Sequence, residues 1–277
     1  MVQIGRMNTL AVKERSADGV YLDGGAAGDV LLDNRSLPSR CQPGDTVEVF
    51  VTVGGDNQLQ ATTRRPLVQV GEFAALKVVS ATSAGAYLNW GLESDLFVPK
   101  GEQQSSMEEG RVYVVFVLVS ERNNRIVASS KLGRFLSSRA PDYQEGQEVD
   151  LFITEKTAMG YEALINRSHL GMIYKNEVFQ PLTIGQHLRG YVRRVRDDLK
   201  IDLSLQQSGY QQVDGVSTAI LNTIRENGGA VALTDKSPPE EIYALFGVSK
   251  KVFKKAVGAL YKKRLVILGN GEIKAAD

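Results

Sequence analysis

The chain has 277 residues, of which 43% are hydrophobic and 23% charged, and its 33 Lys and Arg balance its 32 Asp and Glu. This composition is ordinary for a soluble globular protein, and the length suits two to four domains. A lone cysteine, Cys41, excludes a disulfide framework and a cysteine metal site. The start does not read as a signal peptide, and no apolar run approaches the roughly 20 residues that span a bilayer. We therefore expect a cytoplasmic protein with no membrane partner.

Glycines recur at one spacing in three successive segments. Each set places its second and third glycine 14 and 39 residues after its first: Gly5, Gly19 and Gly44; Gly71, Gly85 and Gly110; Gly146, Gly160 and Gly185. Alternating apolar and β-branched stretches lie between them, such as VYLD, DVLL, TVEVFVTV and LQATT in the first segment. Five short strands per segment, separated by Gly/Asn/Asp turns, predict a small closed barrel, which leaves no exposed sheet edge.

The second segment resembles the S1 RNA-binding domain, a five-stranded oligonucleotide-binding (OB) barrel. The resemblance rests on the opening Val70-Gly71, the strand Gly85-Ala86-Tyr87-Leu88, the Leu96-Phe97-Val98 strand and the closing Arg125-Ile126-Val127-Ala128-Ser129. The third segment matches with Met159-Gly160-Tyr161 and Lys200-Ile201-Asp202. The first segment departs most, because Gly24–Gly28 replaces the usual strand-turn sequence.

Beyond residue 212 the apolar period becomes helical. STAILNTIREN predicts one helix, ended by Gly228-Gly229; a second begins at Ser237 as N-cap with Pro238 first and Glu240 completing a capping box. Ser249 caps a third helix, and a hairpin turns on Asn270-Gly271. Three helices and a hairpin predict a winged helix-turn-helix. Three S1-type units followed by this module resemble the YitL-like, conserved virulence factor B family of bacterial proteins.

The predicted fold is therefore mainly β with a small α+β C-terminal module. Three tandem five-stranded OB barrels of the S1 type span residues 1–66, 67–140 and 141–210, and a winged helix domain spans 211–277.

Binding residues are expected where aromatic rings and basic groups share a barrel face, because OB barrels stack bases on aromatic rings beside phosphate-binding cations. The S1 resemblance favours the second and third strands, although each ring has an alternative place in the barrel core. Trp90 is equally compatible with stacking and with packing against a loop. The candidates in the barrels are Tyr21, Tyr87, Phe97, Arg122, Arg125, Tyr161, His169, Tyr174, Arg193, Arg194 and Lys200.

The third predicted helix carries an unmixed basic stripe. On a helical wheel its lysines form one arc, opposite an apolar side of Val252, Phe253, Ala256, Val257 and Leu260. A solvated helix face normally mixes signs, so the stripe favours an anionic partner over plain solvent or an acidic protein. The stripe residues are Lys250, Lys251, Lys254, Lys255 and Lys262.

The inventory of reactive groups argues against an enzyme. The two histidines, His169 and His187, form no metal-binding pair, and no phosphate-binding loop motif is present. We expect no catalytic residue, no metal and no cofactor. The predicted function is non-catalytic binding of single-stranded RNA, with a regulatory role implied by the family resemblance. DNA is a second candidate partner, through the winged helix, and a scaffold docking on the ribosome or RNA polymerase is a third alternative.

Overall fold

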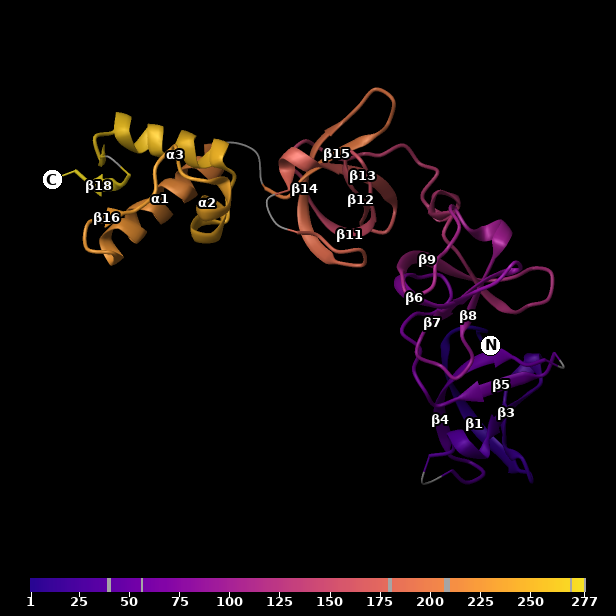
Figure 1. Cartoon of the computed structure of the whole chain (residues 1–277). Coiled ribbons are helices and arrows are strands. Elements are labelled where there is room, and N and C mark those ends of the chain that lie inside the picture. The colour runs from indigo at the N-terminus through magenta and orange to yellow at the C-terminus, as the bar shows by residue number, and fades with distance from the viewer. Residues whose placement is uncertain (39–40, 56, 179–180, 207–209, 270, 277) are drawn as a thin grey trace. The chain divides into compact units, whose positions relative to one another are not determined.

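The computed structural model describes residues 1–38, 41–55, 57–178, 181–206, 210–269 and 271–276. The chain forms two compact units, residues 1–136 and 137–277. The first unit contains two closed barrels, and the second contains one barrel and the winged helix domain (Figure 1). The prediction of a mainly β fold with three five-stranded barrels and a winged helix is confirmed.

The three barrels share one strand order. Barrel 1 closes in the order β1-β2-β3-β5-β4, and the equivalent order holds in the other two. Its strands are β1 (Met7–Arg15), β2 (Gly19–Asp23), β3 (Asp29–Asp33), β4 (Thr46–Val53) and β5 (Leu59–Thr62). Barrel 2 consists of β6 (Phe73–Ala81), β7 (Gly85–Asn89), β8 (Leu96–Pro99), β9 (Val112–Val119) and β10 (Ile126–Ser129). Barrel 3 consists of β11 (Glu148–Lys156), β12 (Gly160–Ile165), β13 (His169–Tyr174), β14 (His187–Val195) and β15 (Ile201–Ser204).

The second glycine of each set is required by close approach of two strands. A Cβ on Gly85 would stand 2.3 Å from the carbonyl oxygen of Val98 on the neighbouring strand. The equivalent distances are 2.0 Å at both Gly19 and Gly160. No side chain fits there, and this explains why the glycine recurs at the start of the second strand of each barrel.

Barrels 1 and 2 pack on each other within the first unit. Phe50 of β4 meets Trp90 edge to face, with ring centroids 5.6 Å apart, and both rings are buried. The Val70 N–H donates to the Gly5 carbonyl oxygen at 2.9 Å. The Trp90 indole N–H donates to the Ser94 carbonyl oxygen at 2.6 Å, so Trp90 packs in this interface.

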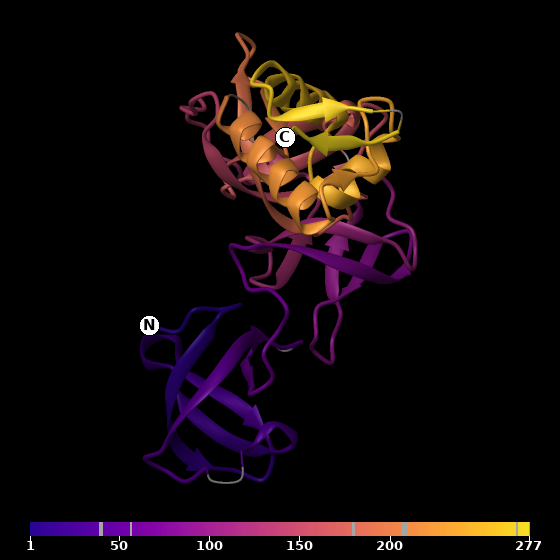
Figure 2. The ribbon, with the colours of Figure 1, turned by 90° about the vertical axis from the view of Figure 1, so that its left-hand side faces the viewer.

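The winged helix domain surrounds one apolar core. Its elements are α1 (Tyr210–Glu226), β16 (Ala230–Val231), α2 (Pro239–Phe246), α3 (Lys250–Lys262), β17 (Val266–Leu268) and β18 (Ile273–Ala275). The strands form a sheet in the order β16-β18-β17, which lies against α1 and α3 (Figure 2). The core side chains include Ile220, Ile224, Ile242, Phe253, Leu260 and Ile273.

The two predicted helix caps had different outcomes. Ser249 caps α3 as predicted, accepting the Val252 N–H. The prediction for Ser237 was wrong: α2 begins one residue later, and Pro238 occupies the N-cap position without a side-chain bond. The Ser237 hydroxyl instead accepts the Thr234 N–H at 3.0 Å and closes the preceding turn. The Asn270 part of the predicted hairpin turn lies outside the described residues.

Candidate nucleic-acid interface

Two aromatic rings stand side by side on the outer face of barrel 2. Tyr87 on β7 is paired across the strands with Phe97 on β8, and both side chains are half-buried. Their ring centroids are 5.0 Å apart and their planes meet at 39°. Such a cross-strand aromatic pair stabilises the sheet and leaves ring faces accessible for stacking.

The same face continues across the barrel to a basic hairpin. Phe97 lies beside Val127 of β10, and Val127 lies opposite Leu118 of β9. The hairpin between these strands exposes Arg122 and Arg125. Neither guanidinium has an ion-pair partner among the described residues, so both are free to meet phosphates.

In barrel 2, neighbours across successive strands form one row on this face: Tyr87, Phe97, Val127 and Leu118. The equivalent rows of the other two barrels carry different side chains. In barrel 1 the row is Tyr21, Leu31, Gln60 and Thr52. In barrel 3 it is Glu162, Met172, Asp202 and Arg194. Barrel 1 therefore keeps one ring at this face, whereas barrel 3 has none in the row. Among the three, barrel 2 alone has two adjacent aromatic residues in its row.

Tyr161, one of the predicted binding residues, takes the alternative place in the barrel core. Its side chain is 8% exposed and belongs to the apolar core of barrel 3. Tyr161 directly follows Gly160, whereas Tyr87 is the second residue after Gly85. A shift of one position along a strand moves a side chain to the opposite face. Tyr161 thus occupies the inward position that Ala86 holds in barrel 2.

Glu162 occupies the outward position that Tyr87 holds. Its carboxylate is half-buried and accepts a hydrogen bond from the Thr154 hydroxyl at 3.0 Å. Burial raises the pKa of the Glu162 carboxyl, and the bond from Thr154 opposes that rise. A carboxylate at this position adds negative charge to a face that would meet phosphates, so barrel 3 is less suited than barrel 2 to stacking a strand here.

Both ring nitrogens of His169 have hydrogen-bond partners within the protein. Its Nδ1 lies 2.9 Å from the Tyr143 hydroxyl, and its Nε2 lies 3.0 Å from the Arg139 carbonyl oxygen. The two rings meet edge to face, with centroids 5.4 Å apart. His169 therefore fastens the segment before β11, and neither ring nitrogen is left for a nucleotide.

An arginine cluster lies on the β14–β15 side of barrel 3. Arg194 and Arg196 both bind the Asp202 carboxylate, with N–O distances of 2.7 Å each. Arg196 also donates to the Tyr174 hydroxyl and lies over the Tyr174 ring, 5.8 Å from its centroid. Burial alone would raise the pKa of Asp202, but the bonds from the two arginines hold it below its ordinary value. The result is a fixed pair of guanidinium groups beside an aromatic ring.

The remaining basic candidates of barrel 3 are paired with acids. Arg193 binds Glu177 at 2.5 Å, and Lys200 binds Asp198 at 3.0 Å. Their charge is therefore partly neutralised in the unbound protein. Sequence reasoning missed Arg196 and Asp202 as parts of the cluster, because the burial of a carboxylate beneath two arginines has no local sequence signal.

The basic stripe on α3 is present but narrower than predicted. The apolar side is buried, as expected, at Phe253, Ala256, Val257 and Leu260. Lys250 donates to the carbonyl oxygens of Lys236 and Ser237, and Lys254 pairs with Asp235 at 3.6 Å. Lys251, Lys255 and Lys262 are exposed and have no ion-pair partner within the described ranges.

Three other features of the described residues bear on function: the Cys41 thiol, the possible metal ligands and the length of the helices. The thiol of Cys41 is buried, and burial raises its pKa, which makes it a poor nucleophile. In the part of the chain that the structure describes, no three His, Cys, Asp or Glu side chains gather as metal ligands. No described helix has the length and apolar character needed to cross a membrane.

Comparison with known proteins identifies both domain types. The S1 domain model matches residues 4–64, and the model of the CvfB-like winged helix domain matches residues 218–274. The S1 match falls on barrel 1, the segment whose sequence departs most from the S1 pattern. Both domain types typically bind nucleic acid without catalysing a reaction.

Several relatives match nearly the whole chain. YitL of Bacillus subtilis is 26% identical in an alignment that covers 96% of this chain and 92% of YitL. Conserved virulence factor B of Staphylococcus saprophyticus is 20% identical, and the match covers 98% of this chain and 93% of that protein. A crystal structure of a multidomain protein with nucleic acid binding domains from Streptococcus pneumoniae TIGR4 aligns with a TM-score of 0.43 at 21% identity over 98% of each chain. The chain is thus a relative of YitL and conserved virulence factor B, built from S1-type barrels and a CvfB-like winged helix domain.

Proposed function

We propose that the chain binds single-stranded RNA without catalysis and acts as a regulator of RNA metabolism or gene expression in the cytoplasm. The observation that carries this proposal is the Tyr87–Phe97 pair beside the unpaired Arg122 and Arg125. Bases of a single strand expose faces that stack on such rings, and phosphates bind the adjacent guanidinium groups.

The winged helix contributes phosphate contacts to this function. Lys251 and Lys255 project from α3 without acidic partners among the described residues. Lysine binds phosphate as a point charge and reads no base. The first turn of α3 exposes no Arg, Asn or Gln that would pair with base edges in a duplex groove. This composition favours RNA as the partner over sequence-specific readout of duplex DNA.

The test is a titration of the full chain with labelled single-stranded RNA, single-stranded DNA and duplex DNA of one sequence at matched salt. We expect the single-stranded RNA to bind most tightly. Tighter binding of duplex DNA would contradict this function and would favour a DNA-binding regulator that acts through the winged helix. Absence of binding to all three would favour a scaffold that docks on the ribosome or RNA polymerase through protein contacts.

A charge variant sharpens the test. Replacing Arg122 and Arg125 by Gln removes two phosphate contacts, so the slope of log affinity against log salt should flatten by about 1.4. Arg111→Gln is the matched control in the same barrel, because that guanidinium already pairs with Glu108 at 3.0 Å. An equal effect of the control would refute the assigned role of the hairpin.

A further inference from the structure

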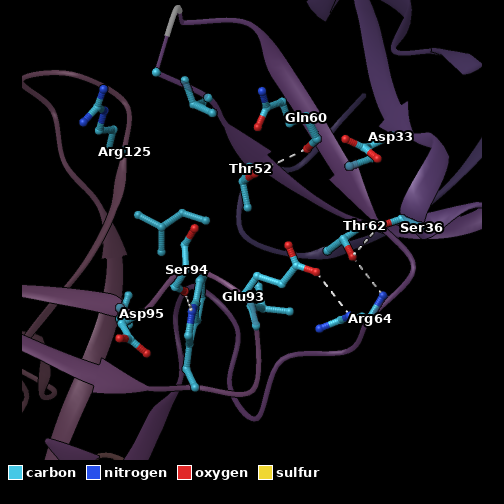
Figure 3. A pocket seen from close by; sticks show the side chains of 18 of the residues that line it. Asp33, Ser36, Thr52, Gln60, Thr62, Arg64, Glu93, Ser94, Asp95 and Arg125 are labelled. Atoms are coloured by element: carbon cyan, nitrogen blue, oxygen red, sulfur yellow. Dashed lines mark hydrogen bonds and ion pairs between the residues drawn. The ribbon is translucent and has the colours of Figure 1, made fainter. Parts of the chain in front are cut away.

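A groove of about 550 Å³ lies between barrels 1 and 2, inside the first compact unit (Figure 3). One wall comes from β3, β4 and β5 of barrel 1, and the other from the segment around β8 and from the β9–β10 hairpin of barrel 2. The volume falls within the range of ordinary ligand sites. Its lining includes Leu31 and Gln60 from barrel 1 and Phe97, Asp95 and Arg125 from barrel 2.

The groove continues the outer face of barrel 2. Phe97 belongs both to the aromatic pair with Tyr87 and to the groove wall. On the opposite wall, Leu31 and Gln60 hold the row positions in barrel 1 that Phe97 and Val127 hold in barrel 2. The outer faces of barrels 1 and 2 that carry these equivalent positions therefore border one groove.

The two walls are held together before any ligand arrives. Phe50 packs on Trp90, the Val70 N–H binds the Gly5 carbonyl, and Arg64 pairs with Glu93 at 3.2 Å at the edge of the groove. A site assembled in advance binds without the entropy cost of bringing its parts together.

The lining suits base edges better than a run of phosphates. Arg35 pairs with Asp33, and Arg64 pairs with Glu93, so these charges cancel within the groove. Arg125 and Asp95 have no ion-pair partner among the described residues, and they too have opposite signs.

Gln60 is the central polar group of this lining. Its side chain is exposed, and its amide has no hydrogen-bond partner in the described part of the chain. A free amide offers both a donor and an acceptor, which matches the mixed edge of a nucleobase. Figure 3 shows the Gln60 side chain on one wall and Arg125 on the hairpin that faces it.

We propose that this groove takes the next nucleotides of the strand that stacks on Tyr87 and Phe97. Gln60 then binds a base edge, and Arg125 binds the phosphate that leads from the barrel 2 face into the groove. This inference rests on the proposed binding of single-stranded RNA, and it makes barrels 1 and 2 one composite site with a length requirement.

The test compares two RNA lengths on the full chain. A strand of about four nucleotides occupies one OB face, and a strand of about twelve extends beyond it. Gln60→Glu keeps the shape of the side chain and places a negative charge in the groove. We expect it to weaken binding of the longer strand about three- to tenfold and to leave the shorter strand within about twofold.

Gln42→Glu is the matched control, since Gln42 is an exposed glutamine of barrel 1 outside the groove lining. Unchanged binding of the longer strand to Gln60→Glu would overturn the composite site. Equal weakening of both lengths by both variants would also overturn it, because the effect would then be general charge repulsion. If wild-type protein binds neither length, the proposed function itself fails; if Tyr87→Ala weakens both lengths and Gln60→Glu neither, only the groove fails.

Discussion

Removal of the Tyr87 ring is the most informative single change to the barrel 2 face. The ring planes of Tyr87 and Phe97 meet at 39°, so the two rings do not stack on each other and each can receive its own base. Tyr87→Ala should therefore remove one stack, worth about 1–3 kcal/mol. That free energy corresponds to a loss of affinity of about five- to 150-fold.

The assay is fluorescence anisotropy of a labelled single-stranded RNA, paired with a denaturation curve of the free protein. Trp90 is the sole tryptophan and is buried against Phe50 beside barrel 2, so its fluorescence reports directly on the folding of that region. Tyr87→Phe is the matched control and should bind nearly as wild type, because it keeps the ring. If Tyr87→Ala binds RNA normally while the Trp90 transition moves to lower denaturant, the ring serves packing and the reasoning is refuted.

Three further predictions concern the second unit. The double variant Lys251→Ala, Lys255→Ala should flatten the slope of log RNA affinity against log salt by about one to one and a half and leave stability nearly unchanged. An unaltered slope would mean that these lysines face solvent or a protein partner and do not contact RNA. Tyr161→Ala should destabilise barrel 3 by about 3–5 kcal/mol, measured by hydrogen exchange of the β12 amides, and normal protection would contradict its core position. Asp202→Asn should lower the free energy of amide protection in β15 by about 1–3 kcal/mol. Breaking a fully buried ion pair would cost more, but Arg194 is 63% exposed. The pKa of Asp202 is lowered in the folded protein, so its contribution to stability is fully present above the ordinary carboxyl pKa near 3.9 and is lost as the pH falls through the folded pKa. Protection of the β15 amides that does not change with pH across that window would contradict the ion-pair assignment.

The barrels were predictable because their sequence requirement is local and repeated. Gly19, Gly85 and Gly160 stand where the neighbouring strand leaves no room for a Cβ, so a fixed spacing marks each barrel. The division of α3 into an apolar and a basic side was predictable for a similar reason, because the regular period of a helix fixes which side chains share a face.

The binding face was harder to predict because strands alternate every residue. Tyr161 and Tyr87 differ by one position relative to their glycines, and this one step separates a core ring from a surface ring. The Asp202 cluster and the groove at Gln60 depend on contacts between distant strands and on the packing of two barrels. No local pattern in the sequence records such contacts.

Photocrosslinking is the measurement that tests the central claim most directly. A single-stranded RNA carrying a photoreactive base is crosslinked to the full chain, and the modified residues are mapped by mass spectrometry. The account predicts crosslinks at Tyr87 or Phe97, which disappear with excess unlabelled RNA. Crosslinks confined to α3 and the β17–β18 hairpin would contradict it and would make the winged helix the primary binding element.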